Sequence, residues 1–225
     1  MTLSIVVPVL NEAANLGRLL EAIREHLQAG DEIIVVDGGS SDDSVLIARR
    51  HADLVLHSDR GRARQMNKGA ECARGDLLWF LHADCRRVLK GHLQALRGLA
   101  DTQQWGRFDV RLSGTHPMLA VIGHAMNLRS RWTGIATGDQ GLFVRRALFM
   151  ELGGFPELPL MEDIALSRRL RGRTRPACLR PRLLADSRRW RQQGIWRTTW
   201  LMWRLRWRYW RGEDPARLHC DYYGN

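Results

Sequence analysis

The chain has 225 residues, of which 44% are hydrophobic and 26% are charged, and its formal net charge is +11. This composition is typical of a globular protein and excludes a disordered or low-complexity chain. The length predicts one domain with room for a small appendage, and the basic balance admits nucleic acid, anionic lipid or phosphorylated compounds as partners.

The first half of the chain alternates apolar runs with segments of helical spacing. Strands are expected at 4–9, 32–36, 53–57 and 76–82, separated by helices within 16–27, 42–50 and 62–74. Strands joined by helices in this order form a parallel sheet with helices on both faces. The strand runs are apolar throughout rather than alternating, which indicates burial on both sides.

The second half alternates less regularly. We expect helices at 89–100, 117–130 and 161–172, strands at 106–113 and within 176–186, a loop at 138–141, and helix through most of the last forty residues.

Three negative observations bear on where the protein works. The four cysteines are scattered without a C-x-x-C pair, which argues against a zinc knuckle or a disulfide framework. The N-terminal stretch MTLSIVVPVLNE lacks the basic start of a signal peptide, and no run of about 18 apolar residues predicts a membrane span. We therefore expect a cytoplasmic protein, which would reach a membrane only from its inner face.

Polar side chains follow the expected strands at one edge of the sheet. Asn11 and Glu12 come after the first strand, Asp37 after the second, and His82 and Asp84 after the fourth. In open parallel sheets, ligands bind outside the carboxyl ends of the strands. The glycine motifs of dinucleotide and P-loop sites are absent, as are G-x-S-x-G and H-E-x-x-H. This edge favours a nucleotide whose diphosphate is neutralised by a divalent metal held on Asp84.

Six sequence blocks occur in an order that resembles the family 2 glycosyltransferases with the GT-A fold. They are SIVVPVLNE, IIVVDGGSSDDS, GRARQMNKGA, LLWFLHADC, GDQGLFVRR and GGFPELPLMEDI, within about residues 3–190. The forms GRARQMN, FLHAD, GDQGLFVRR and SRRW resemble a small bacterial subgroup associated with arsenosugar biosynthesis. The resemblance implies a Rossmann-like, mostly parallel α/β sheet flanked by helices in a catalytic domain, 1–186. A C-terminal amphipathic helical appendage, 187–225, would follow.

This resemblance assigns nucleotide contacts to the first two strand ends. Pro8, Asn11 and Glu12 would border the base and ribose of a nucleotide-diphosphate sugar donor, and Asp37 would accept from a base N–H. A structural alternative stays open for each acid and amide, because Asn11 or Glu12 can cap the first helix and Asp37 can form a turn.

The same resemblance places the diphosphate and its metal beside the fourth strand. Asp84 matches the second acid of the D-x-D metal motif, with His82 at the position of the first and Ala83 beside the donor. Residues two apart on an extended segment share a side, so His82 and Asp84 are expected to face the diphosphate together with Mg²⁺ or Mn²⁺. His82 is alternatively a donor contact or a packed ring. Arg62 or Arg64 would lie near the base or phosphate, or on an exposed helix face.

Glu162 and Asp163 match the acidic pair of the family at a helix start. Asp163 would be the general base that takes the acceptor hydroxyl's proton in one inverting displacement of hexosyltransferase type. Glu162 would position the acceptor or only cap the helix, where acids are favoured in any case. Arg188 and Trp190 lie in SRRW, which resembles an R-W element that meets the diphosphate and acceptor.

The C-terminal segment carries a tryptophan stripe. Five tryptophans recur at helical spacing, at positions 196, 200, 203, 207 and 210. One interpretation is an interfacial helix, 195–211, that contacts anionic lipid and suits a lipid-linked acceptor. The alternative is a helix that packs its stripe on the catalytic domain or on a second subunit in a homodimer.

Two other functions stay open from the sequence. Residues 168–217 contain sixteen arginines and three acids, which fits a polyanion-binding face or a solvated surface. The enzyme alternative is a sugar-phosphate nucleotidyltransferase, and the non-enzyme alternative is a basic membrane or nucleic-acid adaptor. Because the acids Asp37, Asp84 and Asp163 are all present, nucleic acid is the partner we expect least.

Overall fold

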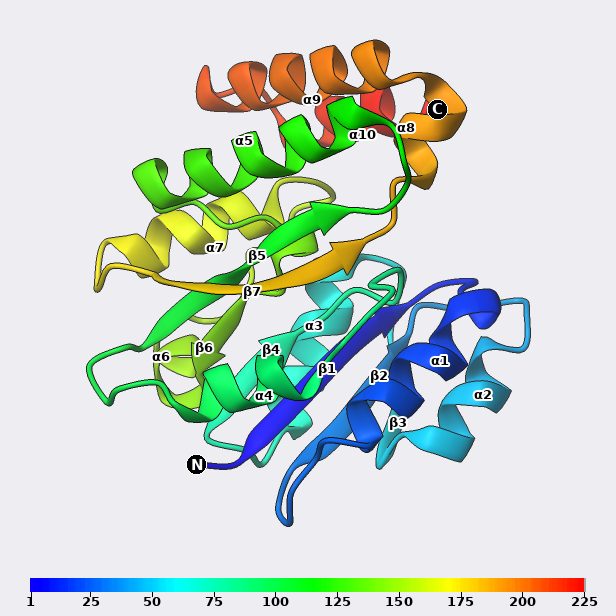
Figure 1. The fold of residues 1–225 in the computed structure, drawn as a ribbon, viewed down its shortest axis with the longest axis vertical. Helices are drawn as coiled ribbons and strands as arrows, with labels where there is room; N and C mark the ends of the chain where they lie inside the picture. The colour runs from blue at the N-terminus through cyan, green and yellow to red at the C-terminus, as the bar shows by residue number, and fades with distance from the viewer. Residues whose placement is uncertain (225) are drawn as a thin grey trace.

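The computed structural model describes residues 1–224 as one seven-stranded sheet with helices on both faces (Figure 1). The strand order is β3-β2-β1-β4-β6-β5-β7. β1, β2, β3 and β4 run parallel, β6 is antiparallel to both β4 and β5, and β5 is parallel to β7. The strands are β1 (Leu3–Val9), β2 (Glu32–Asp37), β3 (Leu54–His57), β4 (Leu77–Phe80), β5 (Trp105–Leu112), β6 (Phe143–Arg145) and β7 (Ala177–Ala185).

Continuous apolar runs bury β1, β2 and β4 completely, as the sequence indicated. The cluster on one face includes residues of α1 (Ala13–Arg24), α2 (Ser44–His51) and α4 (Lys90–Arg97). The cluster on the other includes residues of α3 (Arg62–Cys72), α6 (Arg146–Glu151) and α7 (Glu162–Arg171). The predicted α/β fold with helices on both faces is confirmed.

A long helix, α5 (Pro117–Thr133), packs on β5. Its Asn127 side chain accepts from the Val110 N–H at 2.8 Å and donates to the Val110 carbonyl at 2.9 Å. Because a buried amide that pairs with both groups of one strand residue has little freedom, Asn127 fixes how α5 lies on the sheet.

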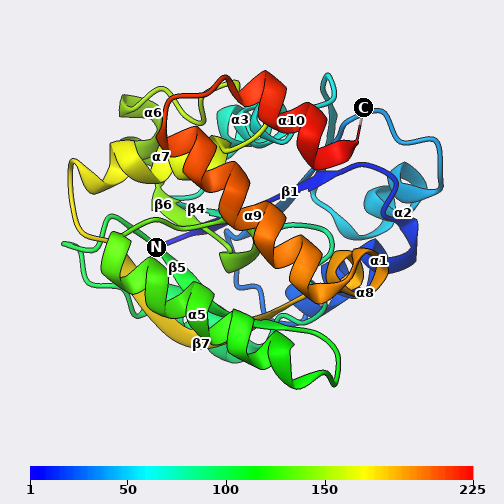
Figure 2. The same ribbon diagram turned by 90° about the horizontal axis from the view of Figure 1, so that it is seen from above.

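Three helices follow the last strand: α8 (Arg188–Gln193), α9 (Ile195–Trp210) and α10 (Pro215–Tyr223). Leu205 of α9 and Leu218 of α10 are buried with Leu160, Met161 and Ile164, around the beginning of α7. Figure 2 shows α9 crossing above the sheet, between α5 and α7. The C-terminal helices therefore cover the end of the sheet at which α7 begins.

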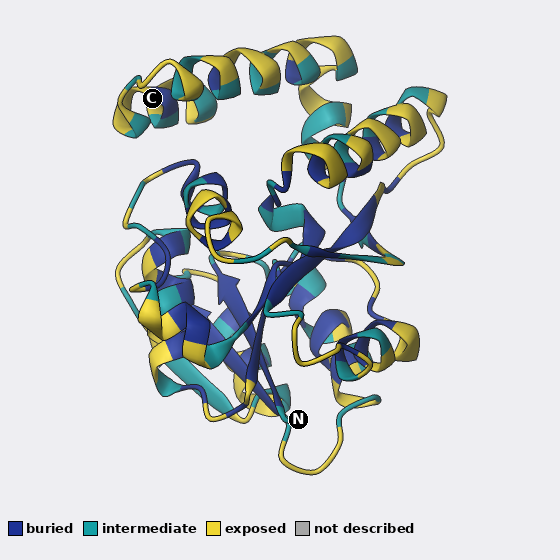
Figure 3. Ribbon diagram, turned by 90° about the vertical axis from the view of Figure 1, so that its left-hand side faces the viewer, coloured by how far each residue is buried: buried dark blue, intermediate teal, exposed yellow. Residues whose placement is uncertain are grey.

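The tryptophan stripe of α9 points away from the protein. Its buried residues are Thr198 and Leu205, whereas the five tryptophans are between 58% and 72% exposed. Exposed residues line the outer side of α9 in Figure 3. The expectation that the stripe packs on the catalytic domain was therefore wrong, because the aliphatic residues on the opposite face make that contact.

One local expectation about the fourth strand was also wrong. β4 ends at Phe80, and the Cys85 N–H donates to the His82 carbonyl at 3.0 Å, which closes a turn through residues 82–85. Because this segment is not extended, the two-residue spacing of His82 and Asp84 does not place their side chains on one side of a strand.

Candidate functional site

The ends of β1 and β2 hold two polar side chains in tight loops. Asn11 has a positive φ of 54°, and its Oδ1 accepts from the Ser41 N–H at 2.8 Å. The Asp37 carboxylate accepts from the Gly39 N–H at 3.0 Å and lies 3.4 Å from His57 Nδ1. The turn-forming alternative is thus realised for Asp37, and both side chains lie where the sequence placed a nucleotide.

Pro8 and Glu12 flank the same loop. Pro8 is buried within β1 beside Val36 of β2. Glu12 Oε1 lies 3.4 Å from Arg188 Nη2, so the beginning of α8 returns to the end of the first strand. This contact places Arg188 beside Glu12, and the nucleotide roles of both residues stay predictions.

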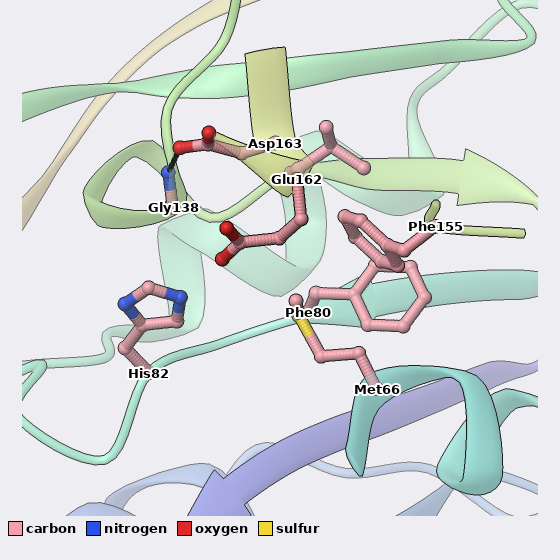
Figure 4. Close-up of a pocket in the computed structure, with 8 residues that line it drawn as sticks. Met66, Phe80, His82, Gly138, Phe155, Glu162 and Asp163 are labelled. Atoms are coloured by element: carbon pink, nitrogen blue, oxygen red, sulfur yellow. Dashed lines mark hydrogen bonds between the residues drawn. The ribbon is translucent and has the colours of Figure 1, made fainter. Parts of the chain in front are cut away.

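Glu162 and Asp163 occupy the first turn of α7 (Figure 4). Asp163 Oδ2 accepts from the Gly138 N–H at 2.8 Å, and its Oδ1 accepts from the Ile164 N–H at 2.7 Å. Glu162 is only 2% exposed; its Oε1 lies 3.0 Å from Arg62 Nε, and its Oε2 is buried without a hydrogen-bond partner among residues 1–224. Burial, reinforced by the Asp163 charge and opposed by Arg62, raises the pKa of Glu162 to about 7.

His82 faces this acidic pair. A cavity of about 10 Å³, roughly the space of one water molecule, is enclosed by Met66, Phe80, His82, Gly138, Leu142, Phe155, Glu162 and Asp163. A Cβ at Gly138 would lie 2.2 Å from His82 Cε1, so the ring leaves room only for glycine there. Burial, with a smaller effect of the Arg62 charge, lowers the pKa of His82 and favours the neutral imidazole.

Asp84 has a carboxylate neighbour that the sequence reasoning missed. Burial, and then the charges of Asp139 and Glu12, raise the pKa of Asp84 to about 7. Asp139 lies in the short helix η1 (Gly138–Gln140), within the GDQG block whose acid received no role. The signal was present, because an acid between two glycines in a conspicuous loop is a candidate ligand.

Asp84 and Asp139 could supply some, but not all, of the ligands that a hard divalent cation needs. Two carboxylates that repel each other offer the oxygen ligands that Mg²⁺ and Mn²⁺ prefer, and a cation would relieve the repulsion. Within residues 1–224, however, no group of three or more histidine, cysteine, aspartate or glutamate side chains is arranged to hold a metal. A metal here would take its remaining ligands from the donor diphosphate or from water.

The other expected site residues differ in how far they are buried. Arg62 is half-buried and pairs with Glu162, whereas Arg64 is exposed and pairs with Glu157 at 3.2 Å. Ala83 is buried. Trp190 packs with an apolar cluster made by β5, α5 and the end of β7. The donor roles of Arg64, Ala83 and Trp190 stay predictions.

The seven-stranded mixed sheet with helices on both faces is similar to solved glycosyltransferases of the GT-A fold. The N-terminal segment (1–349) of TarS from S. aureus, solved with UDP-GlcNAc, is 20% identical, with a TM-score of 0.66 over 83% of this chain and 59% of that one. A mannosyltransferase from Pyrobaculum calidifontis with GDP-Man and Mn²⁺ is 21% identical, with a TM-score of 0.66 over 91% of this chain and 60% of that one. These similarities establish the fold.

Residues 4–146 match the model of the family described as glycosyl transferase family 2. The chain belongs to this family. A PGL/p-HBAD biosynthesis glycosyltransferase of Mycobacterium bovis is 31% identical over 172 residues, which cover 68% of this chain and 62% of the relative. An uncharacterized protein of Mycobacterium tuberculosis is 31% identical over 185 residues, which cover 68% of this chain and 56% of the relative. The chain thus spans about three-fifths of these relatives' length, and the arsenosugar-associated subgroup stays a prediction.

Proposed function

We propose that the chain transfers a sugar from a nucleoside diphosphate to an acceptor hydroxyl, with inversion at the anomeric carbon. The observation that carries the proposal is the position of Asp163 beside the cavity that also contains Glu162 and His82. Two backbone N–H groups orient its carboxylate. As the acceptor oxygen bonds to the anomeric carbon, its proton passes to Asp163 and the bond to the diphosphate oxygen breaks. One displacement from the opposite face inverts that carbon.

The nucleoside would lie outside this cavity, along the strand ends. A cavity of about 10 Å³ has the space of one water molecule and is too small for a nucleoside, since pockets for whole ligands measure roughly 300–1,000 Å³. Asn11 and Asp37 would bind the base and ribose between Pro8 and Glu12. Arg188, which already lies against Glu12, would contact the diphosphate.

Asp84 and Asp139 are the residues that would hold Mg²⁺ or Mn²⁺ next to that diphosphate. A bound divalent cation supplies charge stabilisation of the leaving oxygen. Support comes from a neighbour of the same fold: glucosyl-3-phosphoglycerate synthase from Mycobacterium tuberculosis, 21% identical with a TM-score of 0.61 over 82% of this chain and 70% of that one, was solved with Mn²⁺ and UDP.

A melting-temperature panel of UDP- and GDP-sugars, with and without Mn²⁺, tests donor use. A donor at 100 times its dissociation constant adds roughly 2.7 kcal/mol of stability, which corresponds to about 5–10 °C for a chain of this size. Asp84→Asn should abolish the Mn²⁺-dependent part of the shift and keep a nucleotide-dependent part. If no nucleotide sugar raises the melting temperature, the proposal is wrong. Pyrophosphate release from a nucleoside triphosphate and a sugar phosphate would instead identify a nucleotidyltransferase.

We also propose that the outer face of α9 rests on an anionic lipid surface. Five exposed tryptophans line it, and the Arg204 and Arg211 guanidinium groups stack over the rings of Trp200 and Trp207 at 5.3 and 5.2 Å. Tryptophan favours the interfacial zone of a bilayer, and arginine beside it matches anionic headgroups. Within residues 1–224, no helix is long and apolar enough to span a membrane. Contact would therefore be peripheral.

Co-sedimentation with vesicles at physiological salt tests this contact. We expect binding to vesicles that contain phosphatidylserine, weak binding to neutral vesicles, and loss of binding in Trp203→Ala/Trp207→Ala. Leu46→Ala, an exposed apolar residue of α2, is the matched control. Absence of binding together with a dimer in analytical ultracentrifugation would assign the face to a second subunit instead.

A further inference from the structure

Arg129 and Arg206 both interact electrostatically with Asp163, and neither forms an ion pair with a carboxylate within residues 1–224. Arg129 comes from α5, and its Nε and Nη2 atoms are buried with no hydrogen-bond partner in the described chain. Arg206 of α9 is half-buried and follows Leu205, which packs around the beginning of α7. The ion pairs that α9 makes within residues 1–224 belong to Arg208 instead, which binds Glu213 and Asp221.

The charges of the two arginines affect each other's surroundings and those of Asp163. Burial, and then the charge of Arg206, lower the pKa of Arg129 to about 9, while Asp163 opposes that shift. Burial lowers the pKa of Arg206, and Asp163 and Asp139 oppose it. The two guanidinium groups therefore repel each other in a partly dry space near two acids. Buried charges in proteins are normally paired, so this arrangement lacks an anion.

Neighbouring arginines show what a purely structural guanidinium does in this part of the protein. Arg131, two residues further along α5, binds both oxygens of Asp109 at 2.7 and 2.8 Å. Arg107 on β5 also pairs with Asp109 and donates to the Asn127 carbonyl at 3.0 Å. Arg129 differs from both, because its buried donors point to no acceptor in the described chain.

We propose that Arg129 and Arg206 bind an anionic group, a phosphate monoester or a carboxylate, that belongs to the acceptor. The inference rests on the proposed function, in which the acceptor hydroxyl must reach Asp163. The donor side has a different arginine, since Arg188 contacts Glu12 and acts on Asp84. Two neighbouring guanidinium groups provide the forked donors that phosphate and carboxylate groups prefer. A neutral acceptor would leave both charges unpaired.

Two kinds of acceptor could carry the same anionic group. The tryptophans of α9 are exposed and Arg206 is half-buried, so a lipid phosphate at a membrane surface and a small soluble phosphate both suit the position. Two compounds distinguish these two kinds when each is tested as an acceptor or as a competitor of phosphate binding: glycerol 3-phosphate in solution and a lipid phosphate in detergent micelles. Competition by both shows a site for the phosphate group alone, and competition by the micellar compound alone shows a lipid acceptor.

Calorimetric titration of inorganic phosphate into the protein saturated with UDP and Mg²⁺ tests the subsite. Arg129→Met and Arg206→Met should each weaken phosphate binding roughly tenfold or more, because a charge-assisted hydrogen bond is lost. Arg131→Met, the matched control on the same helix, should keep the phosphate affinity and melt at a lower temperature. Without phosphate, Arg129→Met should melt no lower than the wild type, since it removes an unpaired buried charge.

The results separate this inference from the proposed function. Phosphate affinity within about threefold of wild type in both variants would overturn the subsite. Phosphate binding to the nucleotide-free protein that disappears once UDP saturates it would also overturn the subsite, because the anion would then lie on the donor side. Failure of the wild-type protein to bind any nucleotide would instead overturn the proposed function. Arg206→Gln serves as the second reporter if Arg129→Met does not fold.

Discussion

Replacing Asp163 by asparagine separates its chemical role from its structural one. In the protein, its two oxygens each accept one backbone N–H, from Gly138 at 2.8 Å and from Ile164 at 2.7 Å. Asparagine keeps one oxygen, so its amide group must meet the other N–H as a second donor. One hydrogen bond is lost, and one backbone donor is left without an acceptor.

The two consequences differ in size. An unsatisfied, part-buried donor costs about 1–3 kcal/mol, which corresponds to a melting temperature lower by roughly 3–10 °C for a chain of this length. Removal of a general base lowers the turnover rate by about 10²–10⁴-fold. Donor affinity should stay within about threefold of wild type, because Asp163 takes no part in holding the nucleotide.

Three measurements on one preparation test this expectation: release of nucleoside diphosphate, donor affinity by calorimetry, and melting temperature. Asp31→Asn is the matched control, because the Asp31 oxygens also accept backbone N–H groups, from Leu3 at 2.9 Å and Gln28 at 2.8 Å, at the opposite end of β1. Because Asp31 also pairs with Arg97, this variant should lose at least as much stability as Asp163→Asn and keep the turnover rate. A rate within tenfold of wild type in Asp163→Asn would refute the base assignment, and equal loss of donor binding and rate would make Asp163 a donor ligand.

Three further outcomes follow from contacts around the acidic pair. Arg62→Met leaves Glu162 buried without its cation, so urea denaturation should show a loss of about 3–5 kcal/mol, most of which a second Glu162→Gln change restores. Gly138→Ala brings a Cβ to 2.2 Å from His82 Cε1 and should cost about 1–3 kcal/mol; His82→Ala in the same chain should restore the stability, and no recovery would mean that the backbone is at fault. Because the folded pKa of Glu162 is about 7 and its reference value 4.5, the folded state binds this proton more tightly, and its contribution to stability falls as pH rises across that interval, by up to about 3 kcal/mol. Between pH 5 and pH 7, the melting temperature of Glu162→Gln should change less with pH than that of the wild type. An equal pH dependence in the two proteins would contradict the raised pKa of Glu162.

Local pattern predicted the frame of the site. Apolar runs separated by helical spacing are properties of short segments, and they located β1, β2 and β4 together with the loops that carry Asn11, Asp37 and Asp84. The topology of parallel strands then brings such loops to one edge. The acidic pair at the beginning of α7 was equally visible, since acids in a first helical turn are a local preference.

The directions of the side chains could not be predicted from the same local patterns. The His82–Asp84 spacing predicted a shared face only if the strand continued, and β4 ends at Phe80. Arg62 and Arg64 were equivalent candidates in the sequence, and only contacts with distant segments distinguished them: Arg62 meets Glu162, and Arg64 meets Glu157.

The sequence by itself determined the first four strands, their parallel course and the chemical types at their ends, because apolar runs and helical periods act over a few residues. It did not predict β6, which runs antiparallel to β4 and β5. Only the tertiary structure decided which groups meet. It placed the His82 ring against Gly138, left the tryptophans of α9 exposed and packed Leu205, the neighbour of Arg206, around the beginning of α7. A helix with aromatic, aliphatic and basic residues on different sides offers more than one face for packing. The aliphatic contacts that Leu205 makes around the beginning of α7 selected among them.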